Sequence, residues 1–344
     1  MSNDVVIPQA IIWIISGTCN LRCIHCYASR FIAVKELKLE EKLKLIDELA
    51  ECGVSYIGIT GGEPLINPDL EQCLRRAHDY GIECSVNTNA QCLNEKVADI
   101  LGRYDAYLFI SMDGSRRETH ERIRGPETWD RLMRGIETIG RAGLSFSTVM
   151  TINSLNYLDA AGYVELAERL GADDACMIPV MPVGRANREI APSTSQLITA
   201  LKSAESAAKS IGYWINVWCY VPGKLIIDPR YISTWADCRR GRVVDIDPAG
   251  NLLLCDILDI RLSNVKRGFR QAIGEYFQSK EVNEAMNPRL REPCKSCSIR
   301  ESCMGGCYAR SYIMFKSFDG PDPYCPRANM DLHDFSFSTI MTIK

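Results

Sequence analysis

Short apolar runs alternate with longer amphipathic stretches through the first two-thirds of the chain. The runs are strand-length and rich in β-branched or aromatic residues: Ala10–Ile15, Tyr56–Ile59, Glu83–Asn87, Tyr107–Ser111, Phe146–Thr151 and Ala175–Pro179. Between them, apolar residues recur at helical spacing in Lys38–Cys52, Asp69–Tyr80, Asn94–Gly102, Trp129–Ala142 and Asn156–Leu170. This alternation predicts parallel strands with right-handed crossovers, and six such units predict an α/β fold built on a partial (β/α)6 TIM-like barrel. Catalytic groups should gather at the carboxyl ends of the strands.

The regular alternation ends after the sixth predicted strand. Ser195–Ile211 predicts one more helix, begun by a cluster of serine and threonine residues. From about Tyr213 onward, short strands, turns and cysteines dominate the sequence. We therefore predict a barrel domain over residues 1–212, a C-terminal cysteine-rich domain over 213–330, and a tail over 331–344 that carries no recognisable motif.

Composition narrows the class of protein. The chain is 46% hydrophobic and 24% charged, with a net charge of −3 and acidic and basic residues interspersed. These values indicate a large hydrophobic core. The sequence has no cluster of basic residues of the kind that binds nucleic acid or anchors a protein to a membrane. The most apolar short run, Ala10–Ile15, is far shorter than a membrane span, and no secretory signal precedes it. Sixteen cysteines then predict a reducing, cytoplasmic location.

Ten of the sixteen cysteines fall into two patterns of metal-ligand spacing. The first is a CxxxCxxC run made by Cys19, Cys23 and Cys26. The second begins with Cys238, followed after eleven residues by Gly250 and after four more by Cys255, and it ends with Cys294, Cys297, Cys303, Cys307 and Cys325. Three thiolates complete only part of a four-iron cluster, so the first pattern leaves one iron with an open position where a ligand can be activated.

Cysteines also occur in proteins as buried hydrophobes, in disulfides and as zinc ligands. Five further cysteines lie in apolar or helical runs and are expected to be small buried hydrophobes: Cys52, Cys73, Cys84, Cys92 and Cys176. A disulfide framework suits small secreted chains rather than one of 344 residues. Structural zinc is the main alternative for Cys294 to Cys307, although the N-terminal triad has no fourth ligand at zinc-finger spacing.

Together the two patterns resemble the radical S-adenosylmethionine (SAM) superfamily and its SPASM branch. The SPASM motif has seven cysteines, and here the spacings of two, five and three residues from Cys294 to Cys307 match it without a gap. The resemblance implies a [4Fe-4S] cluster on the triad, bound SAM, and two auxiliary iron–sulfur clusters. In this family an electron from the first cluster cleaves SAM, and the resulting 5′-deoxyadenosyl radical abstracts hydrogen from the substrate.

The resemblance also implies SAM contacts at the ends of successive strands. His25 and Tyr27, beside Cys26, would pack against adenine or shield the cluster, with ordinary packing as the alternative. Gly61-Gly62-Glu63-Pro64 matches the family's GGEP, whose backbone and carboxylate take the SAM ammonium group. Further contacts implied by the family's pattern are Asn87, Thr88, Asn89, Ser111, Arg124, Asn153, Gly184 and Arg185.

Two of these matches have specific alternatives. Asn87-Thr88-Asn89-Ala90 resembles the family's TNG with Ala90 in place of glycine, and the segment could serve only as a turn. Arg124 follows the Ser111-Met112-Asp113-Gly114 motif and suits a carboxylate, because a guanidinium can form two parallel bonds to it. A surface ion pair with Glu118 or Glu121 is the alternative for Arg124.

Carried over from the SPASM branch, the auxiliary ligands divide into two sets. The first set is Cys238, Cys255 and Cys307, and the second is Cys294, Cys297, Cys303 and Cys325. Some relatives add a cysteine soon after the first one, but this chain has none between Cys238 and Cys255, so either the first cluster is open or Cys219 closes it. Asp256 directly follows Cys255, and in the sulfatase-maturing branch such an Asp takes a proton from the substrate; a solvent-facing side chain is the alternative.

These matches predict a radical SAM/SPASM enzyme that modifies a residue of a peptide or protein. A tetrapyrrole-modifying enzyme of haem or haem d1 biosynthesis is the alternative, and an iron–sulfur electron-transfer protein is the non-enzymatic one. An electron donor such as flavodoxin or ferredoxin is expected. Since the first predicted strand starts at Ala10, we expect no peptide-recognition domain ahead of the barrel, so that the barrel itself or a separate recognition protein would select a peptide.

Overall fold

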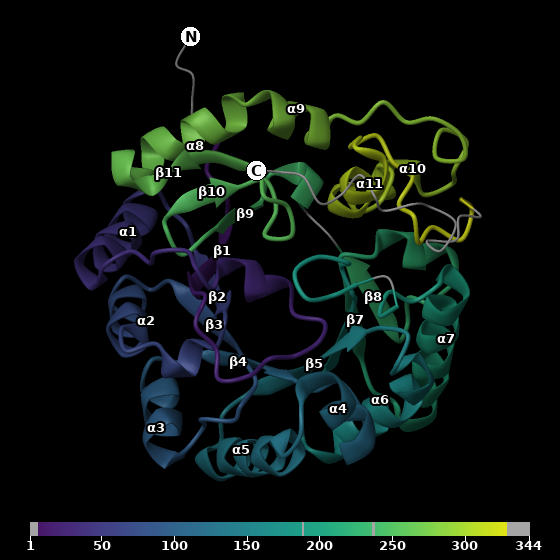
Figure 1. Cartoon of the computed structure of the whole chain (residues 1–344), viewed down its shortest axis with the longest axis horizontal. Helices are drawn as coiled ribbons and strands as arrows, with labels where there is room; N and C mark the ends of the chain where they lie inside the picture. The colour runs from purple at the N-terminus through teal and green to yellow at the C-terminus, as the bar shows by residue number, and fades with distance from the viewer. Residues whose placement is uncertain (1–5, 188, 236–237, 329–344) are drawn as a thin grey trace.

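A computed structural model describes residues 6–187, 189–235 and 238–328, and it is built around one long sheet. The six predicted strands are all present and pair in parallel in chain order (Figure 1): β1 Ala10–Ser16, β2 Tyr56–Gly61, β3 Glu83–Thr88, β4 Tyr107–Ser111, β5 Phe146–Ile152 and β6 Ala175–Pro179. Each strand buries apolar side chains in the core. Because the six strands run in parallel, their carboxyl ends lie on the same rim of the barrel.

The helices form a ring outside these strands, as Figure 1 shows. Their bounds are α1 Leu39–Glu51, α2 Leu70–Asp79, α3 Glu95–Arg103, α4 Arg117–Arg124, α5 Thr128–Ala142, α6 Ala160–Arg169 and α7 Thr194–Ile211. The predicted helix Asn156–Leu170 is in fact a 3-10 turn at Tyr157–Asp159 followed by α6. The apolar faces of these helices join the strands in one core, as Leu45, Ile46 and Leu49 of α1 do.

The sheet continues past Gly212, where we predicted the domain boundary. Two further parallel strands, β7 Ile215–Trp218 and β8 Ile232–Trp235, follow β6. On the other side, β9 Val243–Ile246 pairs in parallel with β1, and β10 Asn251–Leu253 and β11 Arg261–Asn264 add antiparallel strands. Gly212 does end α7, in the left-handed conformation that favours glycine. The C-terminal segment is therefore joined to the barrel by strands at both edges of the sheet.

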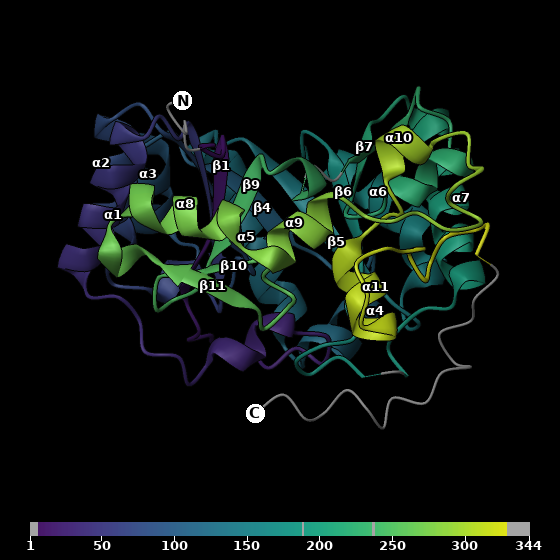
Figure 2. The same ribbon diagram turned by 90° about the horizontal axis from the view of Figure 1, so that it is seen from above.

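The C-terminal segment is more helical than its sequence led us to expect. It contains α8 Phe269–Gln278, α9 Lys280–Met286, α10 Arg300–Cys303 and α11 Tyr308–Phe315. Figure 2 shows α10 and α11 on the same side of the molecule as α7, while α8 lies near α1. Further 3-10 turns cover Tyr27–Phe31, Pro64–Ile66, Val221–Leu225, Cys238–Arg240 and Val265–Arg267. No helix in the described ranges is long and apolar enough to cross a membrane, and the predicted tail over 331–344 lies outside the described residues.

Candidate metal centres and ligand site

The cysteine triad lies on the loop that leaves β1 at the rim of the barrel. Cys23 is buried, while Cys19 and Cys26 are half-buried. The backbone N–H of Leu21 donates to the Cys19 Sγ at 3.4 Å, and Asn89 Nδ2 lies 4.0 Å from the same sulfur. Burial raises the pKa of Cys19 to about 11, and the nearby Glu63, Cys23 and Cys26 add to this effect. The structure thus gathers the three thiols and aims donors at one of them.

The loop after β6 holds this triad loop in place. Gly184 has φ of +67°, and a side chain there would collide with the Cys26 carbonyl oxygen, 2.4 Å from the position of a Cβ. The next residue, Arg185, donates from its backbone to the Cys26 oxygen at 3.0 Å and from Nε to the Cys23 oxygen at 2.8 Å. Both residues were predicted as SAM contacts; in the structure their contacts fix the backbone of the triad.

His25 belongs to a buried hydrogen-bond network that its sequence motif did not predict. Its Nε2 is 2.7 Å from Asp113 Oδ2, and its buried Nδ1 has no hydrogen-bond partner among the described residues. Arg124 donates from Nε to the same Asp113 oxygen at 2.6 Å, and the backbone N–H of Thr151 donates to the other oxygen at 2.8 Å. Burial alone would raise the pKa of Asp113, but Arg124 and His25 hold it well below the usual range.

Asp113 is therefore a site residue that the sequence analysis missed. It belongs to the Ser-Met-Asp-Gly motif, from which only Ser111 was selected. Ser111 is half-buried at the end of β4, while the Asp113 side chain is fully buried. Arg124 therefore forms its ion pair with the buried Asp113, and not with Glu118 or Glu121 at the surface. Asp113 engages Nε, and no acceptor among the described residues bonds the two terminal nitrogens, so these can still donate hydrogen bonds.

The Gly61-Gly62-Glu63 segment packs directly against the triad loop. An added Cβ at Gly62 would lie 2.0 Å from the Thr18 carbonyl oxygen, so only glycine permits this approach. The Glu63 carboxylate is buried and accepts hydrogen bonds from Thr88 Oγ1 at 2.6 Å, Asn89 N at 2.8 Å and Leu65 N at 3.0 Å. Burial raises its pKa in spite of these bonds. Glu63 thus ties the loop after β2 to the loop after β3.

The remaining predicted SAM contacts are distributed along the same rim. Thr88 and Asn89 are buried beside Glu63, and Asn87 is half-buried at the end of β3. The Asn153 side chain is occupied within its own turn, since Nδ2 donates to the Thr151 oxygen and Oδ1 accepts from the Leu155 N–H, both at 2.9 Å. Asn153 therefore stabilises the backbone of the loop after β5.

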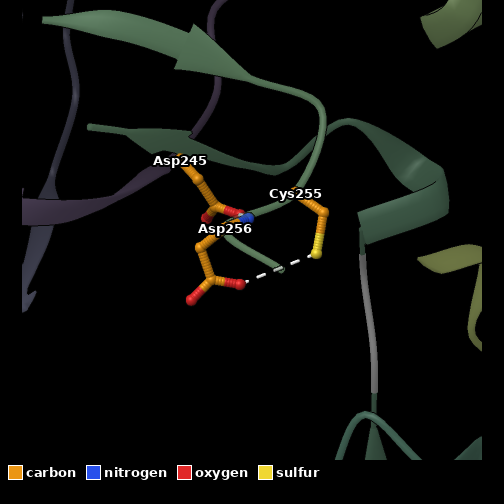
Figure 3. Close-up of side chains that lie close together, drawn as sticks. All are labelled: Asp245, Cys255 and Asp256. Carbon is orange, nitrogen blue, oxygen red and sulfur yellow. Dashed lines mark hydrogen bonds between the residues drawn. The ribbon is translucent and has the colours of Figure 1, made fainter. Parts of the chain in front are cut away.

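A pair of carboxylates lies between the triad loop and Cys255. Figure 3 shows Asp245, from β9, and Asp256 gathered beside Cys255, whose thiol is 3.6 Å from Asp256 Oδ1. Asp245 Oδ2 accepts the backbone N–H of Asp256 at 2.6 Å, and the Tyr27 hydroxyl hydrogen-bonds Asp256. Burial, together with the two like charges, raises the pKa of Asp245 well above its usual range. Asp256 is thus enclosed by polar partners, and Asp245 is a second residue that sequence analysis missed.

The predicted second auxiliary set lies around one cavity. Cys294, Cys297, Cys303 and Cys325 line one pocket, together with Asp322 and residues from the 3-10 turn Val221–Leu225. The Cys325 segment is held by a backbone hydrogen bond, in which the Ala328 N–H donates to the Cys325 carbonyl oxygen at 2.9 Å. Four thiols from two stretches of the chain, 294–303 and Cys325, therefore line the same pocket.

Within the described ranges, the cysteine sulfurs lie further apart than the ligands of one zinc ion. Four thiolates on one zinc ion lie about 3.8 Å apart, because each Zn–S bond is about 2.3 Å. The only three potential ligand atoms of the described residues that lie within 4.8 Å of one another come from Asp245, Cys255 and Asp256.

Comparisons with known proteins agree with this chemistry. Residues 13–167 match the model of the radical SAM superfamily. The chain is 26% identical to an AdoMet-dependent heme synthase of Methanosarcina barkeri, over 92% of this chain and 96% of that protein. It is 29% identical to the mycofactocin maturase MftC of Mycobacterium tuberculosis, over 94% and 84%. The fold is similar to SuiB of Streptococcus suis bound to its precursor peptide SuiA, with a TM-score of 0.75 and 15% identity over 93% of this chain and 76% of that one.

Proposed function

The chain belongs to the radical SAM superfamily, and on that premise we propose that it is a SPASM-type enzyme that modifies a residue of a peptide or protein. The arrangement of residues at the rim of the barrel is the main support for this proposal. There the Cys19 loop, the Gly61–Glu63 segment and the Asp113–Arg124 pair meet within one network of hydrogen bonds. Two further groups of cysteines lie on the C-terminal segment.

When bound, the cluster on the triad supplies the electron that converts SAM to methionine and a 5′-deoxyadenosyl radical able to abstract hydrogen. The chain's own residues hold and orient the reactants. Cys19, Cys23 and Cys26 anchor the cluster, and Arg185 keeps their loop rigid through the Cys23 carbonyl. The free Nη groups of Arg124 offer a paired donor for the SAM carboxylate. Glu63 keeps the glycine backbone close to the triad, where that backbone can approach SAM.

Asp256 is proposed to receive a proton from the substrate. Asp256 follows Cys255 directly, and its side chain interacts with the hydroxyl of Tyr27, the residue after Cys26. Asp256 therefore lies between the triad loop and Cys255, a predicted ligand of the first auxiliary cluster. A carboxylate in this place can accept the proton that a substrate residue loses during oxidation. Asp245 positions it by accepting its backbone N–H. Replacing Asp256 with Asn should abolish product formation while SAM cleavage continues.

Similarity to a maturase and to a complex with a precursor peptide favours a peptide over a tetrapyrrole. The likeness to the Methanosarcina heme synthase covers nearly the whole of that protein, which makes an iron porphyrin the second candidate substrate. MftC acts as a maturase and SuiB was solved with a precursor peptide, which agrees with a peptide substrate here.

We also propose partners and a cellular location for the enzyme. An electron donor such as flavodoxin or ferredoxin would reduce the clusters, and either the barrel or a separate recognition protein would select the peptide. None of the sixteen cysteines, all of which lie in the described ranges, forms a disulfide, and this agrees with a reducing cytoplasmic setting.

The enzyme can be tested without knowledge of its substrate. Anaerobically reconstituted protein, SAM and dithionite should yield 5′-deoxyadenosine and methionine, measured by liquid chromatography. The variant with Cys19, Cys23 and Cys26 all replaced by Ala should form neither product and should lose about four irons per chain. Continued cleavage by that variant would refute the assignment, and faster cleavage by the wild type in the presence of an iron porphyrin would favour the second candidate.

A further inference from the structure

Cys219 has an unusual backbone conformation directly after β7. Its φ is +56°, in the left-handed region that residues with a side chain rarely adopt. The residue lies at the carboxyl end of a parallel strand, where the site loops of this sheet begin. Strained backbone of this kind persists where the surrounding structure requires a particular direction of the side chain.

The surroundings fix Cys219 relative to Cys307. Arg310 donates from Nη2 to the Cys219 carbonyl oxygen, and the same nitrogen is 2.7 Å from Asp322 Oδ2. That carboxylate oxygen accepts the backbone N–H of Cys307 at 3.0 Å. A single guanidinium–carboxylate pair, almost fully buried, therefore bridges the two cysteine backbones.

The predicted ligands Cys238 and Cys255 are tied to the same centre. Arg239, which follows Cys238, donates from Nε to the Gly306 oxygen at 3.1 Å. Tyr308, which follows Cys307, donates its hydroxyl proton to the Leu254 oxygen at 2.6 Å. Cys238, Cys255 and Cys219 are thus each joined to the Cys307 segment through an adjacent residue or an ion pair, and all four belong to the partly buried layer over the core.

We infer that Cys219 is the fourth cysteine ligand of the first auxiliary cluster, with Cys238, Cys255 and Cys307. This rests on the proposed function, since it presupposes that a cluster occupies that site. The cluster is then closed and has no iron position for the substrate, which must be held by the barrel. The site serves electron transfer, and the buried guanidiniums of Arg239 and Arg310 offset the charge of a fourth thiolate.

The test uses full-length protein in which Cys19, Cys23 and Cys26 are replaced by Ala, so that only auxiliary clusters remain. This background should hold about eight irons per chain after reconstitution. Cys219→Ala and Cys219→Ser are added separately, with Cys52→Ala, at the C-terminal end of α1, as the matched control. Iron content and the EPR spectrum of the dithionite-reduced protein are measured for each.

Loss of about four irons, or a changed auxiliary EPR signal, in both Cys219 variants but not in Cys52→Ala is the expected result. Unchanged iron and EPR in both would overturn the inference. If the Cys219 variants fail to fold, cyanide is added to the background protein: an unchanged EPR signal supports a closed cluster, and a shifted signal reveals an open iron. A background without iron would instead refute the proposed auxiliary sites.

Discussion

Replacing Asp113 with Asn should strongly destabilise the barrel rim, because it leaves Arg124 buried without its partner. The Asp113 side chain is fully buried and that of Arg124 is 9% exposed. The Asn amide can offer one oxygen only, so either Arg124 or the Thr151 N–H loses its acceptor. Removing one member of a buried ion pair costs about 3–5 kcal/mol. With an unfolding entropy of about 2 cal/mol/K per residue, that corresponds to a decrease in Tm of about 4–7 °C for a chain of this length.

The assay is anaerobic thermal unfolding followed by circular dichroism, at matched iron content. The double variant Asp113→Asn with Arg124→Met removes both charges and should recover a large part of the lost stability, because no buried charge is left unpaired. Both variants should bind SAM more weakly than wild type in isothermal titration. A Tm within about 1 °C of wild type for Asp113→Asn would contradict this expectation. So would a double variant whose loss of stability exceeds the sum of the losses in the two single variants.

Three further variants test other parts of the site. Glu63→Gln replaces a buried acceptor of three hydrogen bonds and should weaken SAM binding roughly tenfold with iron content unchanged; equal affinity in titration would exclude this role. His120 of α4 is buried, and its Nδ1 accepts the backbone N–H of Asp113 at 3.3 Å. Burial lowers the pKa of His120 to about 3, so the unfolded chain binds the extra proton between pH 6.5 and 3, and stability falls as pH falls through this window. His120→Gln should flatten that slope by up to about 1.4 kcal/mol per pH unit in denaturant titrations, and an unchanged slope would count against a neutral His120. Arg185→Ala should speed the loss of iron from the triad to a chelator, with exposed Arg141→Ala as control, and equal rates would remove Arg185 from that role.

The barrel strands could be predicted because each is a short apolar run bounded by turn residues. β4 and β6 begin and end as the sequence predicted, and β1 ends only one residue later. Helix α4 was missed because its sequence, Arg-Glu-Thr-His-Glu-Arg-Ile-Arg, has almost no apolar stripe. Helix α8 was missed although Phe269, Ala272, Ile273 and Tyr276 repeat at helical spacing, a signal that could have revealed it.

The candidate cluster cysteines could be selected by their spacing, since ligands on one loop must recur at fixed intervals. Their supporting residues could not. Asp113 meets His25 across 88 positions of sequence, and Arg310 reaches Cys219 across 91, so only the folded chain brings them together. Glu63 and Arg185 were expected to touch SAM, and the structure shows that they also bind neighbouring loops, a use that no local motif records.

The most direct test of the central claim is the EPR spectrum of the triad cluster while SAM is added. The protein for this measurement has Cys238, Cys255, Cys294 and Cys297 replaced by Ala, so that the signal of the dithionite-reduced sample comes from the triad alone. An iron with only three thiolate ligands to its cluster is open to SAM, so the spectrum should change as SAM is titrated and should saturate at one SAM per chain. A spectrum that stays the same at saturating SAM would contradict the account.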